Sequence, residues 1–194
     1  MDILTISIIL IVLIAVAVLL MYNRLIALRN RVEEAWADID VQLRRRYDLI
    51  PNLVDTVKGY AKHERETLEQ VMEARSKASS IEVDASSVSP EQVAALAGAE
   101  AGLGGMLGKL MAVAEAYPDL KADQNFVELQ NSLEDTENKI QAARRFYNGN
   151  VRDFNTIIQT VPYNLLTSLG EFNEREYFEL PKESEAREPV DVQF

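Results

Sequence analysis

One stretch of the sequence, residues 3–21, restricts the chain more than any other feature. Seventeen of these 19 residues are Ile, Leu, Val, Ala or Met, and only Thr5 and Ser7 interrupt them. A helix of this length measures about 28 Å, which matches the hydrocarbon core of a bilayer. We therefore expect a single membrane anchor over residues 1–22. Its lipid-facing side chains would include Ile3, Ile8, Leu13, Val18 and Met21.

A cleaved signal peptide is the alternative interpretation of the same residues. Residues 15–17 read Ala-Val-Ala, which resembles a cleavage site. However, no Lys or Arg precedes the apolar run, and the run continues past this site to Met21. Both features are atypical of signal peptides. The sequence therefore favours an uncleaved, single-pass anchor in contact with the lipid bilayer.

The charged residues that flank the anchor predict its orientation. No Lys or Arg precedes it, whereas Arg24, Arg29 and Arg31 follow it closely. Basic residues are enriched on the cytoplasmic side of membrane helices. We therefore expect the N-terminus outside the inner, or plasma, membrane and the remainder of the chain in the cytoplasm.

The overall charge and the absence of cysteine exclude several classes of function. The net charge is −11, which disfavours nucleic acid as a partner. There is no Cys, so disulfides, thiol nucleophiles and thiolate metal sites are excluded. Residues 171–194 contain eight acids, three bases and two prolines, and this composition predicts an acidic, mobile tail.

Beyond the anchor, apolar residues recur every three or four positions, and no alternating strand pattern competes with them. Short connections between long amphipathic helices favour antiparallel packing. We therefore predict an all-α fold in which the anchor precedes an antiparallel, up-and-down four-helix bundle over residues 23–170. Its helices are expected at about 24–47, 50–79, 90–116 and 125–160.

The boundary between the first two of these helices rests on Pro51. Proline has no backbone N–H to donate to residue 47, and it disfavours helical geometry at Ile50. These effects favour a break, with Asp48 capping a new helix. A kinked but continuous helix is the alternative, because the apolar periodicity runs through the site.

The predicted third helix is unusually rich in glycine. Each glycine costs a helix about 1 kcal/mol relative to alanine, so a compensating role is expected. Close packing inside the bundle is the favoured role. Self-association and contact with lipid or a partner are the alternatives. The four-residue spacing that permits close approach relates Gly98 to Gly102 and Gly104 to Gly108.

Three consecutive arginines, Arg44, Arg45 and Arg46, form the one basic cluster of the bundle. They would lie about 35 Å beyond the membrane interface, which is too far to bind the same leaflet. Ion pairs with acids on neighbouring helices are the favoured interpretation. A docking site for an acidic partner, such as the tail of another copy, is the alternative.

Motifs that carry chemistry are absent from the sequence. His63 is the only histidine, so neither a two-histidine zinc motif nor a di-iron bundle can form. No Gly-x-Ser-x-Gly motif and no Gly-rich loop that ends in Gly-Lys-Ser/Thr occurs. We therefore assign no catalytic, cofactor-binding or metal-binding residues, and a metal-dependent enzyme is the least favoured function.

Several short segments are distinctive, among them Ala35-Trp36, Arg45-Arg46-Tyr47-Asp48-Leu49-Ile50-Pro51-Asn52, Ala116-Tyr117-Pro118-Asp119, Thr136-Glu137-Asn138 and Tyr147-Asn148. Together these segments resemble the LemA family, over roughly residues 20–179. One small departure is Asp123, where we would expect Asn.

The resemblance implies a four-helix bundle behind one N-terminal membrane helix, in bacteria, with no established enzymatic activity. It supplies no catalytic residues. LemA-like proteins include members tied to specialised membranes and others linked to envelope maintenance or membrane proteases. We therefore expect a non-enzymatic scaffold or adaptor of the cell envelope, which forms homo-oligomers or binds other membrane proteins. A self-assembling, membrane-shaping protein is the alternative.

Overall fold

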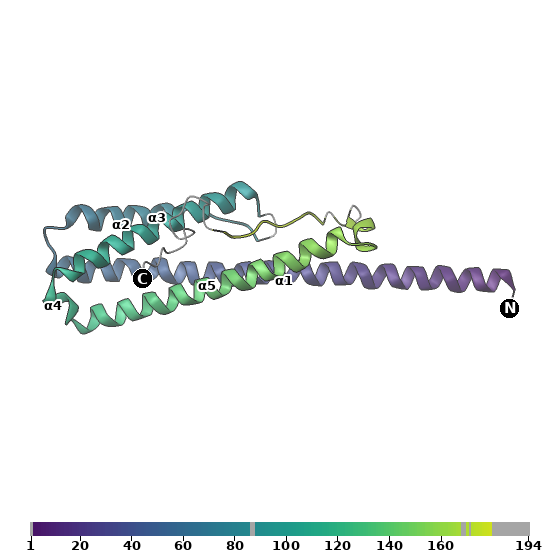
Figure 1. The fold of residues 1–194 in the computed structure, drawn as a ribbon, viewed down its shortest axis with the longest axis horizontal. Coiled ribbons are helices and arrows are strands. Elements are labelled where there is room, and N and C mark those ends of the chain that lie inside the picture. Colours follow the sequence, from purple (N-terminus) through teal and green to yellow (C-terminus); the bar gives the residue numbers. More distant parts are fainter. Residues whose placement is uncertain (1, 86–87, 168–169, 171, 180–194) are drawn as a thin grey trace, which may run out of the picture.

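The structure is a computed structural model that describes residues 2–85, 88–167, 170 and 172–179. Within these ranges it is all-helical and contains no strand, as predicted. The four helices of 15 residues or more lie side by side and alternate in direction (Figure 1). The elements are α1 (Ile3–Tyr60), α2 (Arg65–Ser79), α3 (Pro90–Glu115), the short α4 (Pro118–Lys121), α5 (Gln124–Gln159) and the 3₁₀ helix η1 (Tyr163–Leu165).

Helix α1 is continuous for 58 residues, so the predicted break at Pro51 is wrong. Pro51 leaves the Tyr47 carbonyl without its usual intrahelical donor. The Arg75 side chain of α2 replaces that donor, because its Nε atom lies 2.8 Å from the Tyr47 carbonyl oxygen. The chain turns instead at residues 61–64, so the expected helices 24–47 and 50–79 have the wrong boundary.

Local capping explains where α3 and α5 begin. Ser89 and Gln92 form a reciprocal capping box, with both hydrogen bonds at 3.2 Å, and Pro90 occupies the first turn. Asp123 accepts a hydrogen bond of 2.9 Å from the Phe126 N–H at the start of α5. Both helices therefore start within one residue of the positions expected from the sequence.

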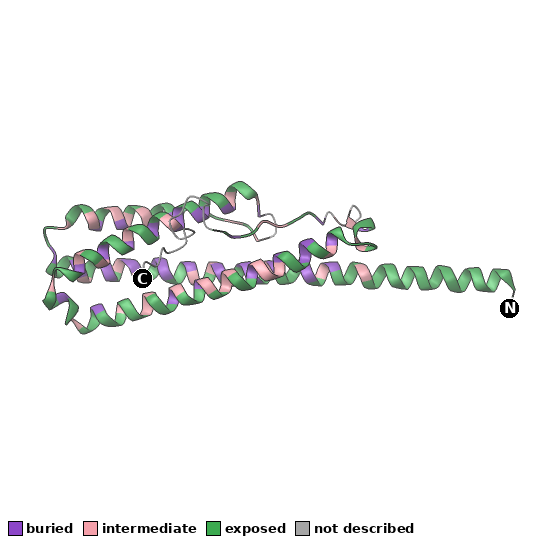
Figure 2. Ribbon diagram, in the orientation of Figure 1, coloured by how far each residue is buried: buried purple, intermediate pink, exposed green. Residues whose placement is uncertain are grey.

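The core runs along the contact between α1 and α5, and α2 and α3 cover its far half. Buried residues recur along these helices, whereas the N-terminal part of α1 is exposed throughout (Figure 2). The first buried residue of α1 is Leu25. Among the largest fully buried side chains are Tyr147 and Phe154 of α5 and Ile39 of α1. The bundle therefore begins immediately after the apolar run.

Residues 172–179 correct the expectation of a mobile tail. This segment, which we call the strap, packs against the bundle and buries Phe172 and Phe178. It runs back along the bundle from η1 (Figure 1). Residues 180–194, the rest of the predicted tail, lie outside the described residues.

Candidate functional site

The apolar segment of α1 extends beyond the bundle without any protein contact that would bury it. An 18-residue window has a mean hydropathy of 3.4, and none of it is buried. Ile3, Ile8, Leu13 and Val18 are exposed, and Met21 is half-buried where the core begins. An apolar helix with no protein cover is suited to lipid. The chain is therefore membrane-associated through this segment.

The three arginines predicted as one basic cluster occupy different environments. Arg44 is exposed and pairs with Asp40 one turn earlier, at 2.8 Å. Arg45 is half-exposed and lies 3.9 Å from Asp135 of α5. Arg46 is only 5% exposed, so it belongs to the interior rather than to an interaction surface. The interpretation as ion pairs across helices therefore describes Arg45 and Arg46.

Arg44 also faces an acidic groove. This open groove of about 920 Å³ lies between α1 and the segment that joins α2 to α3. Four acids line it, Asp40, Asp48, Glu82 and Asp84, and they outnumber its two bases, Arg44 and Arg75. An acidic partner would meet charges of its own sign there, so this environment disfavours the docking of an acidic tail at Arg44.

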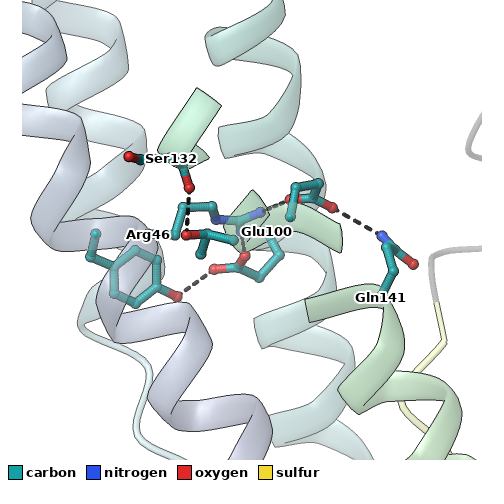
Figure 3. Close-up of polar contacts among 7 residues, drawn as sticks. Arg46, Glu100, Ser132 and Gln141 are labelled. Atoms are coloured by element: carbon teal, nitrogen blue, oxygen red, sulfur yellow. Dashed lines mark hydrogen bonds and ion pairs between the residues drawn. The ribbon is translucent and has the colours of Figure 1, made fainter. Parts of the chain in front are cut away.

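The interior contains a charged network that joins α1, α3 and α5 (Figure 3). Arg46 forms ion pairs with Glu100 of α3 and, at 2.7 Å, with Glu137 of α5. The Tyr47 hydroxyl donates a hydrogen bond to Glu100. Gln141 donates to Glu137 at 3.0 Å. Three helices are thus held together by one buried cation.

The electrostatics of this network are those of a structural element. Burial raises the pKa of Tyr47 to about 12, against a smaller lowering by Arg46. The phenol therefore remains a proton donor at neutral pH. Burial also lowers the pKa of the nearby Arg144. The adjoining recess has a volume of about 190 Å³. Its charged lining residues are two acids, Glu100 and Glu137, and two bases, Arg46 and Arg144, so the charges balance. Among the residues that line it there is no Ser, Cys or His to act as a nucleophile or base.

Most of the glycines of α3 face away from the bundle. Gly98, Gly102 and Gly108 are exposed, and so is Gly104, which borders the recess beside Arg46 and Glu100. A Cβ atom added at any of them would meet no atom within 4 Å outside its own stretch of helix. The favoured prediction of close packing inside the bundle is therefore wrong. The role of this outward face stays a prediction.

Two asparagines of α5 fix the strap through paired hydrogen bonds. The Asn148 amide accepts from the Phe178 N–H at 2.9 Å and donates to its carbonyl at 3.2 Å. The Asn155 amide makes the same two bonds with Arg175, both at 2.9 Å. Seven helical residues and three extended residues both span about 10 Å, so the two pairs are in register.

Aromatic and charged side chains complete the docking of the strap. The Trp36 ring of α1 packs edge-on against Tyr147 and Phe178, with centroids 5.2 and 5.6 Å apart. The Tyr147 hydroxyl donates to the Glu176 carbonyl at 2.8 Å. Arg175 lies 3.6 Å from Glu33 of α1. The strap thus completes the core on the membrane side of the bundle.

Sequence reasoning missed Glu100 and the strap, although signals for both exist. Glu100 stands between Leu96 and Leu103 on the apolar face of α3, and an acid at a core position requires a partner. Asn148 and Asn155 are seven residues apart on one face of α5. No local pattern identifies their partners, because these contacts join segments 20 to 91 residues apart.

Metal-ligating side chains do not gather in the part of the chain that the structure describes. No group of three or more His, Asp or Glu there could hold a metal ion. His63 is exposed in the turn between α1 and α2.

Comparison with known proteins identifies similar sequences. The sequence profile of the LemA family matches residues 35–194. Magnetosome protein MamQ 2 of Paramagnetospirillum magneticum is 28% identical over 186 residues, which cover 84% of this chain and 67% of that protein. Magnetosome protein MamQ of Magnetospirillum gryphiswaldense is 26% identical, over 90% of this chain and 71% of that protein.

A further relative has a different name. Protein LemA of Metamycoplasma hominis is 30% identical over 138 residues, which cover 71% of this chain and 59% of that protein. None of these names indicates an enzymatic activity.

Proposed function

The chain belongs to the LemA family, and from this premise we propose that it is a non-enzymatic, membrane-anchored scaffold or adaptor of the bacterial cell envelope. The single observation that carries the proposal is the continuity of α1. The same helix contains the exposed apolar segment and, from Leu25 to Val57, one wall of the bundle core. An unbroken helix transmits position and orientation from the membrane to the bundle.

The contacts of α1 support a rigid connection. Its longest set of contacts is with α5, and the buried pair of Arg46 with Glu100 adds α3. At the membrane end, Tyr22 packs edge-on against Phe172 with centroids 5.7 Å apart. Arg29 lies 5.8 Å from the centre of the same ring. Contacts between the strap and α1 thus begin within one turn of the apolar run, and α1 itself continues there without interruption.

The orientation forms part of the proposal. Arg24, Arg29 and Arg31 follow the apolar segment, so we place the bundle on the cytoplasmic side of the inner membrane. Because the chain has no Cys, single-cysteine variants report accessibility without background labelling. An impermeant maleimide should label Val41→Cys in inside-out vesicles and leave it unlabelled in intact spheroplasts. Labelling in intact spheroplasts would contradict this orientation.

Crosslinking at the native expression level tests the scaffold function. A photoreactive residue at Phe146, which is 58% exposed on α5, should capture other membrane proteins or second copies. The same residue at the buried Phe154 position serves as the matched control and should capture none. Recovery of only an uncrosslinked monomer from both sites would remove the basis of the proposal.

A self-assembling, membrane-shaping protein is the second candidate, and the outward face of the α3 glycines favours it. Gly98, Gly102 and Gly105 share one exposed stripe that two helices could bring close together. Gly102→Leu should then reduce oligomers, whereas Gly149→Leu on α5, where a Cβ also meets no neighbour, should not. Overproduction without altered membrane morphology in electron tomograms would count against this function.

A further inference from the structure

The longest uncharged run outside the anchor extends from Phe154 to Gly170. These 17 residues contain no Asp, Glu, Lys or Arg, although charged residues make up 26% of the chain. The run includes the end of α5, the turn at residues 160–162 and η1. Charges are costly to remove from water, so an uncharged surface of this length is suited to an environment other than bulk water.

The structure places this run at the membrane end of the bundle. The Phe172 N–H donates to the Thr167 carbonyl at 3.1 Å, and the Phe172 ring contacts Tyr22, the first residue after the apolar segment. Figure 1 shows η1 at the point beyond which α1 continues alone toward its N-terminus. Residues 160–167 therefore lie at the level where the anchor ends.

Two apolar side chains of this turn point away from the protein. Val161 is 77% exposed and Leu165 is 70% exposed, the highest values for large apolar residues outside the anchor among the described residues. Between them, the half-buried Tyr163 contributes an amphipathic ring, a residue type enriched at membrane interfaces. Leu166 is buried and fixes the turn to the core.

Several backbone N–H groups of the turn are satisfied within it. The N–H groups of Asn164 and Leu166 donate to the carbonyls of Thr160 and Tyr163, both at 2.9 Å. The Leu165 N–H donates to the Pro162 carbonyl at 3.2 Å. Internal hydrogen bonds lower the cost of moving a backbone segment from water into a less polar region.

From these observations we propose that residues 160–167 form a second membrane contact, which inserts Val161 and Leu165 into the interface of the leaflet where the anchor ends. The partner is the lipid headgroup and upper acyl region, because this surface continues directly from the anchor. The inference rests on the membrane anchor of the proposed function and adds a second point of attachment. Two points of attachment restrict the rotation of the bundle about the axis of the anchor.

Depth-resolved fluorescence on the full-length chain tests this contact. Single variants Leu165→Cys, Val41→Cys and Leu13→Cys are labelled with an environment-sensitive fluorophore and reconstituted into phosphatidylcholine–phosphatidylglycerol vesicles. Val41 is the matched control, because it is 59% exposed on α1 but about 30 Å beyond the anchor. Leu13 lies within the anchor and reports whether the chain is inserted.

The expected result is a graded response. A lipid with a headgroup nitroxide should quench the label at position 165 at least about twofold more than the label at position 41, as expected for a side chain within about 5–10 Å of the headgroups. Aqueous iodide should show the opposite order. If position 165 matches position 41 while position 13 is protected from iodide, the second contact is refuted and the anchor stands. If position 13 is also open to iodide, the anchor itself fails. The same measurements on Val161→Cys check the result independently.

Discussion

The buried guanidinium of Arg46 offers a direct test of what fixes the helices of the bundle to one another. Arg46→Met keeps most of the side-chain volume but leaves Glu100 buried without its cation. The side chains of Arg46 and Glu100 are 6% and 8% exposed. Removal of one member of such a pair costs about 3–5 kcal/mol, because the remaining charge stays in the interior. The hydrogen bond from Tyr47 to Glu100 offsets only part of this cost.

Arg44→Met is the matched control, two positions earlier on the same helix. The Arg44 side chain is 72% exposed, and its pair with Asp40 is a surface contact between adjacent turns. Such pairs contribute about 0.3–0.5 kcal/mol. The double variant Arg46→Met/Glu100→Leu removes both buried charges, so it should recover most of the stability that Arg46→Met loses.

Urea unfolding of the full-length chain in detergent micelles, followed by circular dichroism at 222 nm, measures these differences in free energy of unfolding. If Arg46→Met lies within about 1 kcal/mol of Arg44→Met, the network does not hold the bundle together. If the double variant is no more stable than Arg46→Met, the cost does not arise from an uncompensated charge.

Three further predictions concern the strap, a helix cap and the tyrosines. Asn148→Ala should loosen the strap and raise its cleavage by trypsin. Asn150→Ala is the control and should leave cleavage unchanged, because the Asn150 amide donates to the Phe146 carbonyl of its own helix, at 2.9 Å. Equal cleavage of the two variants would contradict the role of the paired bonds. The pKa of Asp123 is lowered, first by the backbone N–H that it caps, so its contribution to stability is lost as the pH falls through that pKa. When the pH is lowered from neutral to acidic, the melting temperature of Asp123→Asn should therefore fall less than that of the natural chain. Parallel curves of melting temperature against pH for the two proteins would contradict this. Burial raises the pKa of Tyr47 and of Tyr147 to about 12, so the stability that they contribute should fall as the pH rises from about 10 to 12. A titration followed by absorbance at 295 nm should show late deprotonation of these two, and a single step near pH 10 for all seven tyrosines would refute it.

The fold was predictable where the signal is local. The apolar spacing of α5 and the Ser89-Pro90 start of α3 depend on neighbouring residues, and both helices begin where the sequence indicates. Pro51 is different, because its effect depends on a distant side chain. Arg75, 28 residues from Tyr47, supplies the donor that the helix lacks. Local rules therefore predict a break that a tertiary contact prevents.

The candidate sites likewise divide into those with a local signal and those that depend on distant contacts. The anchor could be predicted from the sequence, because a bilayer imposes length and apolarity on a continuous stretch. The different environments of the arginines could not be predicted from the sequence. Arg44 and Arg46 differ only in the face of α1 that they occupy and in the presence of Glu100 opposite Arg46. The strap was missed because its composition is that of a mobile tail, whereas its order comes from Asn148 and Asn155 on another segment.

The continuity of α1 has a mechanical consequence. Tyr60 lies 39 positions after Met21, and this length of helix measures about 58 Å. Membrane helices are tilted from the bilayer normal by about 20° on average, and a helix that is long for its bilayer tilts further. With a lever of this length, such a tilt moves the far end of the bundle sideways by about 20 Å. On the proposed membrane anchor, a change in bilayer thickness would therefore become a lateral displacement of the far end of the bundle.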